Sequence, residues 1–232
     1  MCLVQSFPLD ASLPEALRAV HVATVVGAVV SIAVMGDDRA RLDDVIEGAG
    51  FAPLGLRRHG DGWRLRLERL RTLPDTVAAE MRVLVVGLNP SVVAADAGYG
   101  FAGPSNRFWK AAVAAGVVAT ARDPVAALVH DRVGMTDVVK RATPRSARVT
   151  AEEYRSGVER VERLVVWLAP AAVCFVGLEG WRAARDRRAA AGWQQGGFGG
   201  RPAYVMPSTS GLNASARLDD LVRHLRVASG RA

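Results

Sequence analysis

Three short segments carry residue types from which a reaction site can be built. They are Gly-Leu-Asn-Pro-Ser at residues 87–91, Phe-Ala-Gly-Pro-Ser-Asn-Arg-Phe-Trp-Lys at 101–110, and Met-Pro-Ser-Thr-Ser-Gly-Leu-Asn-Ala at 206–214. The amide of Asn89 has no useful basicity, so it can orient a water molecule but does not deprotonate it. Taken singly, the segments are typical of a turn after a strand, aromatic core residues at a helix start, and a helix cap. The order and spacing of all three segments are more specific than the pattern of any one of them.

Together the segments resemble the mismatch-specific uracil and thymine DNA glycosylases of the uracil-DNA glycosylase superfamily. Asn89 and Phe101 keep that family's spacing of twelve residues. Asn-Arg-Phe-Trp at 106–109 matches its second block, and Gly-Met-Thr-Asp at 134–137 resembles its Gly-x-Thr segment. The resemblance covers residues 73–228. It implies a base-excision repair enzyme that removes uracil, or a mispaired or modified pyrimidine, from double-stranded DNA.

The resemblance also implies roles for single residues. The base must leave the DNA stack before its bond to the sugar is cut, and Phe101 offers a flat ring for it to stack on. Asn89 is the expected catalytic residue, holding the attacking water below the sugar. The residues expected to bind the base are Gly87, Leu88, Phe101, Asn106 and Asp137. Those expected to contact DNA or fill the gap left by the base are Ser208, Ser210, Gly211, Leu212, Asn213 and Arg217.

Several positions depart from the family pattern. Ser91 replaces a glycine, and Ala94 replaces a serine found in some members. Asp137 stands where relatives carry lysine or asparagine, and Ala214 stands where an arginine often follows the wedge. We expect Arg217 to replace that arginine. These changes leave a second interpretation open, a lesion- or mismatch-binding protein with weak or no catalysis.

The elements around the segments predict an α/β fold. Residues 82–86 and 171–176 are continuous apolar runs, typical of strands covered on both faces, and 203–206 is a third strand. Helices are expected at 106–115, 152–168, 181–190 and 218–227, and a Gly- and Gln-rich loop at 192–200. Strands separated by helices indicate a three-layer sandwich with a mostly parallel sheet, in which ligands bind beyond the carboxyl ends of the strands.

Residues 1–72 read as a small α/β appendage before a main domain at 73–232. A helix is expected at 14–20, a strand within 25–35, a helix capped by Asp37 or Asp38, and a hairpin of 54–58 with 63–70. We expect these strands to extend or cover an edge of the main sheet. The piece weakly resembles the end of a class I methyltransferase, which gives a third interpretation, but the glycine-rich cofactor loop is absent.

Composition sets outer limits on function. The chain has 232 residues and a net charge of +7 carried almost entirely by arginine, which suits a nucleic-acid partner but is also common in GC-rich genomes. Two cysteines, Cys2 and Cys174, are too few for an iron–sulfur cluster or a structural zinc site, and no metal or cofactor is expected. The lysines are Lys110 and Lys140 alone, so we expect a monofunctional enzyme. No membrane span or signal peptide is expected, and we predict a cytoplasmic monomer associated with the nucleoid through DNA.

Overall fold

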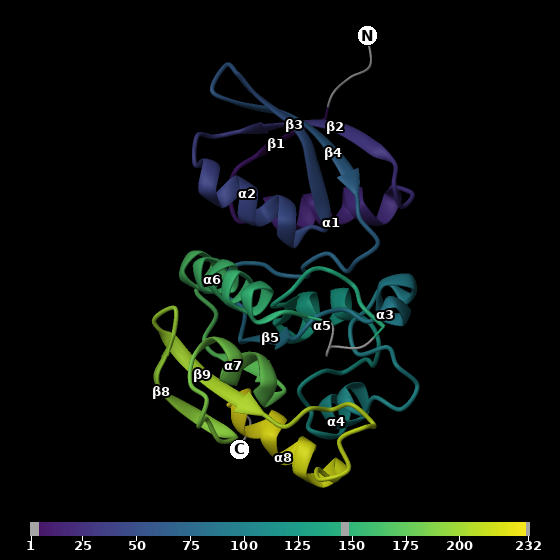
Figure 1. The fold of residues 1–232 in the computed structure, drawn as a ribbon, viewed down its shortest axis with the longest axis vertical. Helices are drawn as coiled ribbons and strands as arrows, with labels where there is room; N and C mark the ends of the chain where they lie inside the picture. Colours follow the sequence, from purple (N-terminus) through teal and green to yellow (C-terminus); the bar gives the residue numbers. More distant parts are fainter. Residues whose placement is uncertain (1–4, 145–148, 231–232) are drawn as a thin grey trace.

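The computed structural model describes residues 5–144 and 149–230, which form two separate sheets. The strand order is β1-β2-β4-β3 in the first sheet and β6-β5-β7-β9-β8 in the second. Figure 1 shows the first sheet with its helices at one end of the molecule and the second sheet with its helices at the other. Cys2 lies outside the described residues.

The amino-terminal unit alternates strands and helices and closes with a hairpin. Its elements are β1 (Gln5–Pro8), α1 (Leu13–Ala23), β2 (Val29–Met35), α2 (Arg39–Gly48), β3 (Phe51–His59) and β4 (Gly62–Arg69). Asp38 is the residue that caps α2, since its carboxylate accepts a hydrogen bond from the Arg41 backbone N–H. The hairpin prediction is confirmed, because β3 and β4 pair antiparallel.

The structure differs from the prediction for this unit in two ways. The sequence predicted no strand before the first helix, but β1 lies there and pairs parallel with β2 at the edge of the sheet. The strands also do not extend the main sheet. Ile32, Val34, Leu65 and Leu67 alternate toward α1 and α2 and are buried there. The apolar face of the strands is therefore buried within the unit itself.

The second unit contains the mostly parallel sheet that the sequence predicted. Its elements are β5 (Val83–Gly87), α3 (Val92–Ala97), α4 (Phe108–Ala114), α5 (Pro124–Asp131), β6 (Val133–Asp137), α6 (Ala151–Leu168), β7 (Val173–Val176), α7 (Leu178–Ala184), β8 (Gly192–Phe198), β9 (Arg201–Met206) and α8 (Leu218–Ala228). Strands β6, β5, β7 and β9 run parallel, and β8 pairs antiparallel with β9.

The sequence interpretation missed two strands of this sheet. The segment 192–200, expected to be a loop, contains β8, whose Trp193 packs edge-on against Tyr204 at 5.1 Å between ring centroids. Gly196 and Gly197 have positive φ at a register shift in this strand, so glycines that suggested a loop serve an irregular edge strand instead. Strand β6 was missed because its five residues include Gly134 and lack a clear apolar run.

Helices cover both faces of the main sheet, which confirms the three-layer sandwich. Alternate strand residues such as Leu84 and Phe175 pack against α6 and α7, and their neighbours such as Val85 and Cys174 pack against α4 and α8. Burial raises the pKa of the Cys174 thiol to about 12, which keeps it a neutral core side chain. Gly157 lets α6 approach the sheet, because a Cβ there would collide with the Val138 carbonyl.

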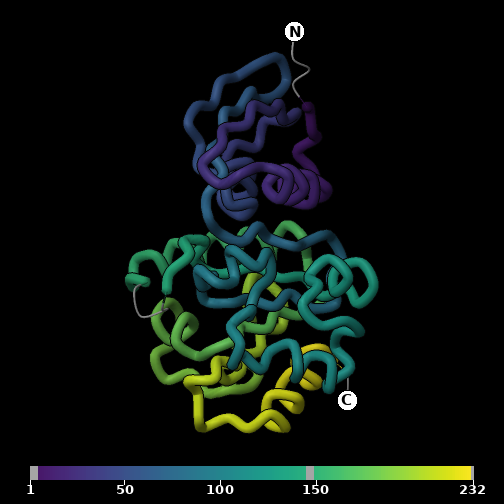
Figure 2. The backbone as a smooth tube through the Cα atoms, turned by 90° about the vertical axis from the view of Figure 1, so that its right-hand side faces the viewer, coloured from purple at the N-terminus to yellow at the C-terminus, as the bar shows by residue number. Residues whose placement is uncertain are grey.

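A buried ionic cluster joins the linker after β4 to the main unit, at the junction visible in Figure 2. The Asp75 carboxylate accepts hydrogen bonds from Thr136 at 2.6 Å, Lys140 at 2.8 Å and Arg160 at 2.9 Å. Its backbone N–H donates to the Gly48 carbonyl at the end of α2, at 2.7 Å. One aspartate thus contacts the amino-terminal unit, β6 and α6 at once.

None of the helices in the described part of the chain combines the length and the apolar character that crossing a membrane would require.

Candidate functional site

The ends of two neighbouring strands bring three predicted base-binding residues together. Gly87 ends β5 and lies opposite Asp137, which ends β6. A Cβ on Gly87 would collide with the Asp137 carboxylate and would lie 3.6 Å from the Phe101 ring. A side chain at 87 would therefore have to displace the Asp137 carboxylate. These residues lie at the carboxyl ends of parallel strands, the edge at which the sequence predicted a ligand to bind.

Asn89 follows β5 by two residues, and its amide nitrogen is anchored. Its Nδ2 donates to the Thr143 hydroxyl at 2.8 Å, to the Pro90 carbonyl at 3.1 Å and to the Arg141 carbonyl at 3.2 Å. Within residues 5–144 and 149–230, no group donates to its Oδ1. The side chain is half-buried, and its carbonyl oxygen keeps its capacity to accept a hydrogen bond.

The residues that anchor Asn89 were not identified from the sequence. Arg141 is itself held by Glu153 at the start of α6, with Nε–Oε1 and Nη2–Oε2 distances of 2.7 and 3.0 Å. The Arg141 guanidinium, together with the Thr150 backbone N–H, lowers the pKa of Glu153 to about 2. Thr143 is buried. A single sequence carries no signal for these contacts, because residues 89, 143 and 153 meet only in the folded chain.

Phe101 has a backbone conformation that residues other than glycine rarely adopt. Its φ is +60°, and its ring stacks on Phe108 with 4.1 Å between centroids. The neighbouring Trp109 donates from its indole nitrogen to the Gly100 carbonyl at 2.9 Å. The aromatic residues of the second segment therefore form the support beneath Phe101, which reconciles the core interpretation of Phe108 and Trp109 with a site role for Phe101.

The cavity beside Phe101 is small. It measures about 20 Å³, and its lining includes Tyr99, Thr136 and Asp137 but not Asn89. This volume holds about one water molecule. A pyrimidine therefore fits only if the walls of this cavity move apart.

The surroundings of Asp137 favour its neutral form. Burial raises its pKa to about 6, with Asp75 acting in the same direction and Lys140 and Arg160 opposing it. Arg160 donates to the Asp137 backbone carbonyl at 2.8 Å, while no group in the described residues donates to its carboxylate. The carboxyl group thus has no donor among these residues, and it keeps its proton to a higher pH than an exposed aspartate does.

Two other predicted base-binding residues have structural partners. The Asn106 oxygen accepts a hydrogen bond from the Phe108 backbone N–H at 3.0 Å at the start of α4. The Leu88 carbonyl accepts one from the Val139 backbone at 2.9 Å, and its side chain packs against Gly180. The backbone N–H of Leu88 has no acceptor in the described residues, so it can still donate a hydrogen bond to a base. Base contacts by either residue stay predictions.

Arg107 holds the third segment against the second. Its guanidinium donates to the Ser210 carbonyl at 2.9 Å, to the Asn213 carbonyl at 2.8 Å and to the Ala216 carbonyl. Its backbone N–H donates to the Thr209 carbonyl at 2.9 Å. The sequence showed Arg107 as part of a motif but gave it no role. Its fork of donors fixes the loop at residues 207–217.

That loop presents Leu212 to solvent. Leu212 is 93% exposed, and Gly211 beside it packs so closely on Ser105 that a Cβ would collide. The Asn213 amide is tied within the loop, since Nδ2 donates to the Ser208 carbonyl at 2.8 Å and Oδ1 accepts from the Ser215 hydroxyl at 2.7 Å. An exposed leucine on a loop held by hydrogen bonds is compatible with the predicted wedge. The amide of Asn213, in contrast, already makes hydrogen bonds within the loop.

The remaining DNA-contact candidates flank this leucine. The Ser208 and Ser210 hydroxyls accept weak backbone hydrogen bonds at 3.3 Å from Ser210 and Leu212, which leaves both free to donate. Arg217 is exposed at the start of α8 and makes no side-chain ion pair in the described residues. The departure at Ser91 has a local explanation, because its hydroxyl caps α3 by accepting from the Ala94 backbone at 3.1 Å.

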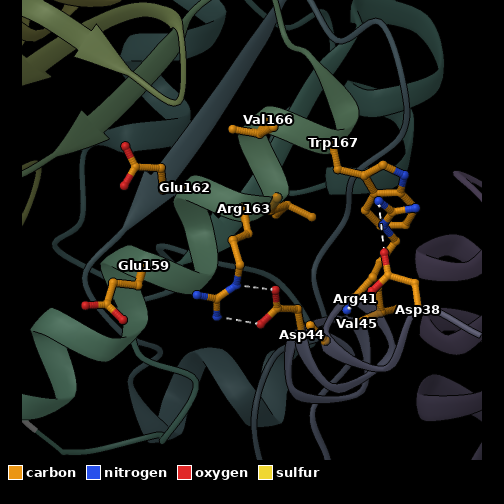
Figure 3. Close-up of a pocket in the computed structure, with 11 residues that line it drawn as sticks. Asp38, Arg41, Asp44, Val45, Glu159, Glu162, Arg163, Val166 and Trp167 are labelled. Atoms are coloured by element: carbon orange, nitrogen blue, oxygen red, sulfur yellow. Dashed lines mark hydrogen bonds and ion pairs between the residues drawn. The ribbon is translucent and has the colours of Figure 1, made fainter.

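A larger cavity, of about 430 Å³, lies between α2 and α6 and is shown in Figure 3. Its walls carry the Arg163–Asp44 ion pair at 2.7 Å, and Arg41 lies over the Trp167 ring at 5.0 Å. None of the candidate site residues lines it. It belongs to the interface between the two units. Within the described residues, no cluster of three metal-binding side chains occurs.

Comparison with known proteins agrees with this architecture. The family model of the Uracil DNA glycosylase superfamily matches residues 74–226. The chain is also similar to a solution NMR structure of a protein from Methanosarcina acetivorans named a putative uracil DNA glycosylase, with 20% identity and a TM-score of 0.50 over 69% of this chain and 97% of the other. At that identity, the likeness concerns the fold. Since the family model spans well over half of the sequence, the chain belongs to the Uracil DNA glycosylase superfamily, whose members are DNA glycosylases.

Proposed function

We propose that the protein is a monofunctional DNA glycosylase that excises uracil, including mispaired uracil and related modified pyrimidines, from double-stranded DNA. In this proposal it works as a monomer without metal or cofactor and falls in the mismatch-specific branch of the superfamily. The observation that carries the proposal is Asn89. Its amide nitrogen is anchored at three acceptors, and its oxygen is left to accept a hydrogen bond from a water molecule.

In this mechanism the water held by Asn89 attacks the sugar carbon C1′ as the bond from C1′ to the base nitrogen breaks. The electron pair of that bond leaves with the base. One proton of the water stays on the new hydroxyl group at C1′, and the other is released to solvent. Asn89 orients the water but does not remove its proton. In the proposal, the Leu88 backbone N–H stabilises negative charge on the departing base, and preorganised donors of this kind are often the largest contribution to catalysis.

Base flipping requires the DNA to be held while the nucleotide leaves the stack. In the proposal, Leu212 enters the gap left by the base, as apolar side chains enter between base steps in some DNA-binding proteins. Ser208, Ser210 and Arg217 contact phosphates on either side and fix the register of the duplex. The extruded base lies against Phe101, with Asp137 at its edge.

The test is Asn89→Ala with a duplex that carries one uracil. We expect excision to fall by at least about 100-fold, because the water loses its orientation, while affinity for the duplex is kept. Gln195→Ala, which removes an exposed amide on β8, is the matched control and should excise at the parent rate. Excision by Asn89→Ala at the parent rate would contradict the proposal.

A second candidate is a lesion-binding protein with little turnover. The small cavity beside Phe101 favours it, because a flipped pyrimidine does not fit there unless the walls move. The same assay separates the two functions. An enzyme yields abasic sites in proportion to time, whereas a binding protein retains the uracil duplex without converting it.

A further inference from the structure

The amino-terminal sheet has one face that no described element covers. Helices α1 and α2 pack on the other face, and Figure 1 shows them between the sheet and the main unit. In β4, Leu65 and Leu67 point toward these helices and are buried. Side chains alternate along a strand, so Arg64 and Arg66 lie on the open face, and both are exposed.

The strand register places a third arginine among these two. Arg57 of β3 lies directly opposite Arg64, and Arg66 follows on the same face two residues along. Cross-strand neighbours are about 5 Å apart and residues i and i+2 about 7 Å apart, so the three side chains leave the sheet within one small patch. The β2 residues opposite Arg64 and Arg66 are Ala33 and Ser31, whose side chains are too small to cover the arginine patch.

These arginines lack the counter-charges found elsewhere in the protein. Arg71 pairs with Asp96 and Arg163 with Asp44, but Arg57, Arg64 and Arg66 make no ion pair or side-chain hydrogen bond in the described residues. Five arginines and two acids occur in residues 51–70. One of those acids, Glu68, lies on the open face one row beyond Arg66, opposite Val29 and Ala52.

Like charges directly opposite each other destabilise a sheet. The Arg57–Arg64 pair is therefore unfavourable in the free protein, and an anionic partner would relieve the repulsion. Guanidinium groups suit phosphate oxygens in particular, because their planar donors form paired hydrogen bonds. A row of phosphates fits a patch of three arginines better than a single small anion does.

We propose that this arginine face, formed by Arg57, Arg64 and Arg66, binds the phosphate backbone of double-stranded DNA. The choice of DNA among polyanions rests on the proposed function. The face points away from the main unit, and in Figures 1 and 2 it lies at the opposite end of the molecule from α8 and the loop before it. The arginine face therefore holds a different stretch of DNA from the one at Leu212, and residues 1–72 act as a second DNA-binding domain.

The experiment measures binding of an undamaged, fluorescently labelled duplex by anisotropy over a range of NaCl concentrations. The variant is Arg57→Gln/Arg64→Gln, and the matched control, with the same change in charge, is Arg187→Gln/Arg188→Gln, at two exposed arginines after α7. Each lost phosphate contact lowers the slope of log K against log salt by about 0.9, so the variant should lose about 1.8 and bind at least about tenfold more weakly at low salt. The control should match the parent.

The same variants are tested on vesicles of phosphatidylglycerol, and their melting temperatures are measured by circular dichroism. The replaced side chains are exposed and repel each other, so Arg57→Gln/Arg64→Gln should melt no lower than the parent. An unchanged salt slope for DNA overturns the proposal, as does a loss of vesicle binding with DNA binding intact. Excision is not required in this assay. If the parent fails to remove uracil, the proposed function falls and the result for the arginine face still stands.

Discussion

Among the single residues of the site, Asp137 is the one whose charge changes near physiological pH. Its carboxyl group lies against Gly87, close to Phe101, and burial raises its pKa to about 6. A neutral carboxyl group both donates and accepts a hydrogen bond, whereas a carboxylate only accepts. Uracil presents a carbonyl oxygen beside an N–H. The neutral form of Asp137 therefore matches this edge, and the charged form repels its oxygen.

We predict that uracil excision declines as the pH rises through about 6, because Asp137 loses the proton with which it binds the base carbonyl. Asp137→Asn keeps a donor and an acceptor at every pH, so its excision should not decline in this range and should exceed the parent's at pH 8. Measurement of kcat/KM against pH for both proteins checks this. Identical profiles would exclude Asp137 as the group that reads the base.

At the scale of elements, the loop at residues 207–217 is positioned by a residue outside it. Arg107, just before α4, reaches three of its carbonyl groups through one planar guanidinium. Lysine is charged too but presents a single ammonium group, which cannot bridge three carbonyls in fixed directions. The loop and the start of α4 therefore behave as one body in the free protein.

We predict that Arg107→Lys lowers kcat/KM for uracil excision by about 10- to 100-fold, since a displaced wedge loop no longer holds the flipped nucleotide in register. Lys110→Arg, an exposed change on the same helix, should leave the rate unchanged. Parent-like excision by Arg107→Lys would show that the loop keeps its place without the guanidinium fork.

How far the sequence predicted these features depended on how local each signal was. Strand β5, helix α6 and the loop holding Leu212 were predicted because apolar runs, helical spacing and short motifs lie within contiguous residues. Strand β8 was missed because its glycines are typical of loops, although pairing with β9 compensates for their poor strand propensity. The anchoring of Asn89 by Thr143 was not predictable, since it depends on a contact across 54 residues.

For the whole molecule, the buried cluster around Asp75 connects the two units. Burial by itself would raise the pKa of Asp75, but Lys140 and Arg160 outweigh it and hold the pKa below the ordinary value. The stability that this carboxylate provides is therefore present above pH 3.8 and is lost as the pH falls through its lower pKa in the folded protein. Removal of the charge takes away the ion-pair partner of buried Lys140 and leaves buried Arg160 with only the more distant Glu47, at 4.0 Å, among the described residues.

We predict that Asp75→Asn lowers the free energy of unfolding at pH 7 by about 3–5 kcal/mol, as is typical when one partner of a buried ion pair is removed. Asp96→Asn breaks the exposed pair with Arg71 and should lower the free energy of unfolding much less, because solvent screens this pair. Urea denaturation of the three proteins gives the comparison. Equal losses for the two variants would mean that the cluster adds no more than a surface ion pair.

The exposure of Leu212 has a thermodynamic consequence. Folding leaves this side chain hydrated, so the roughly 1.5–3 kcal/mol that accompanies full burial of a leucine is released only when a partner covers it. Removing that apolar surface from water also makes the heat capacity of association more negative. Calorimetric titration at several temperatures would therefore register whether the leucine enters the duplex, independently of any chemistry at the sugar.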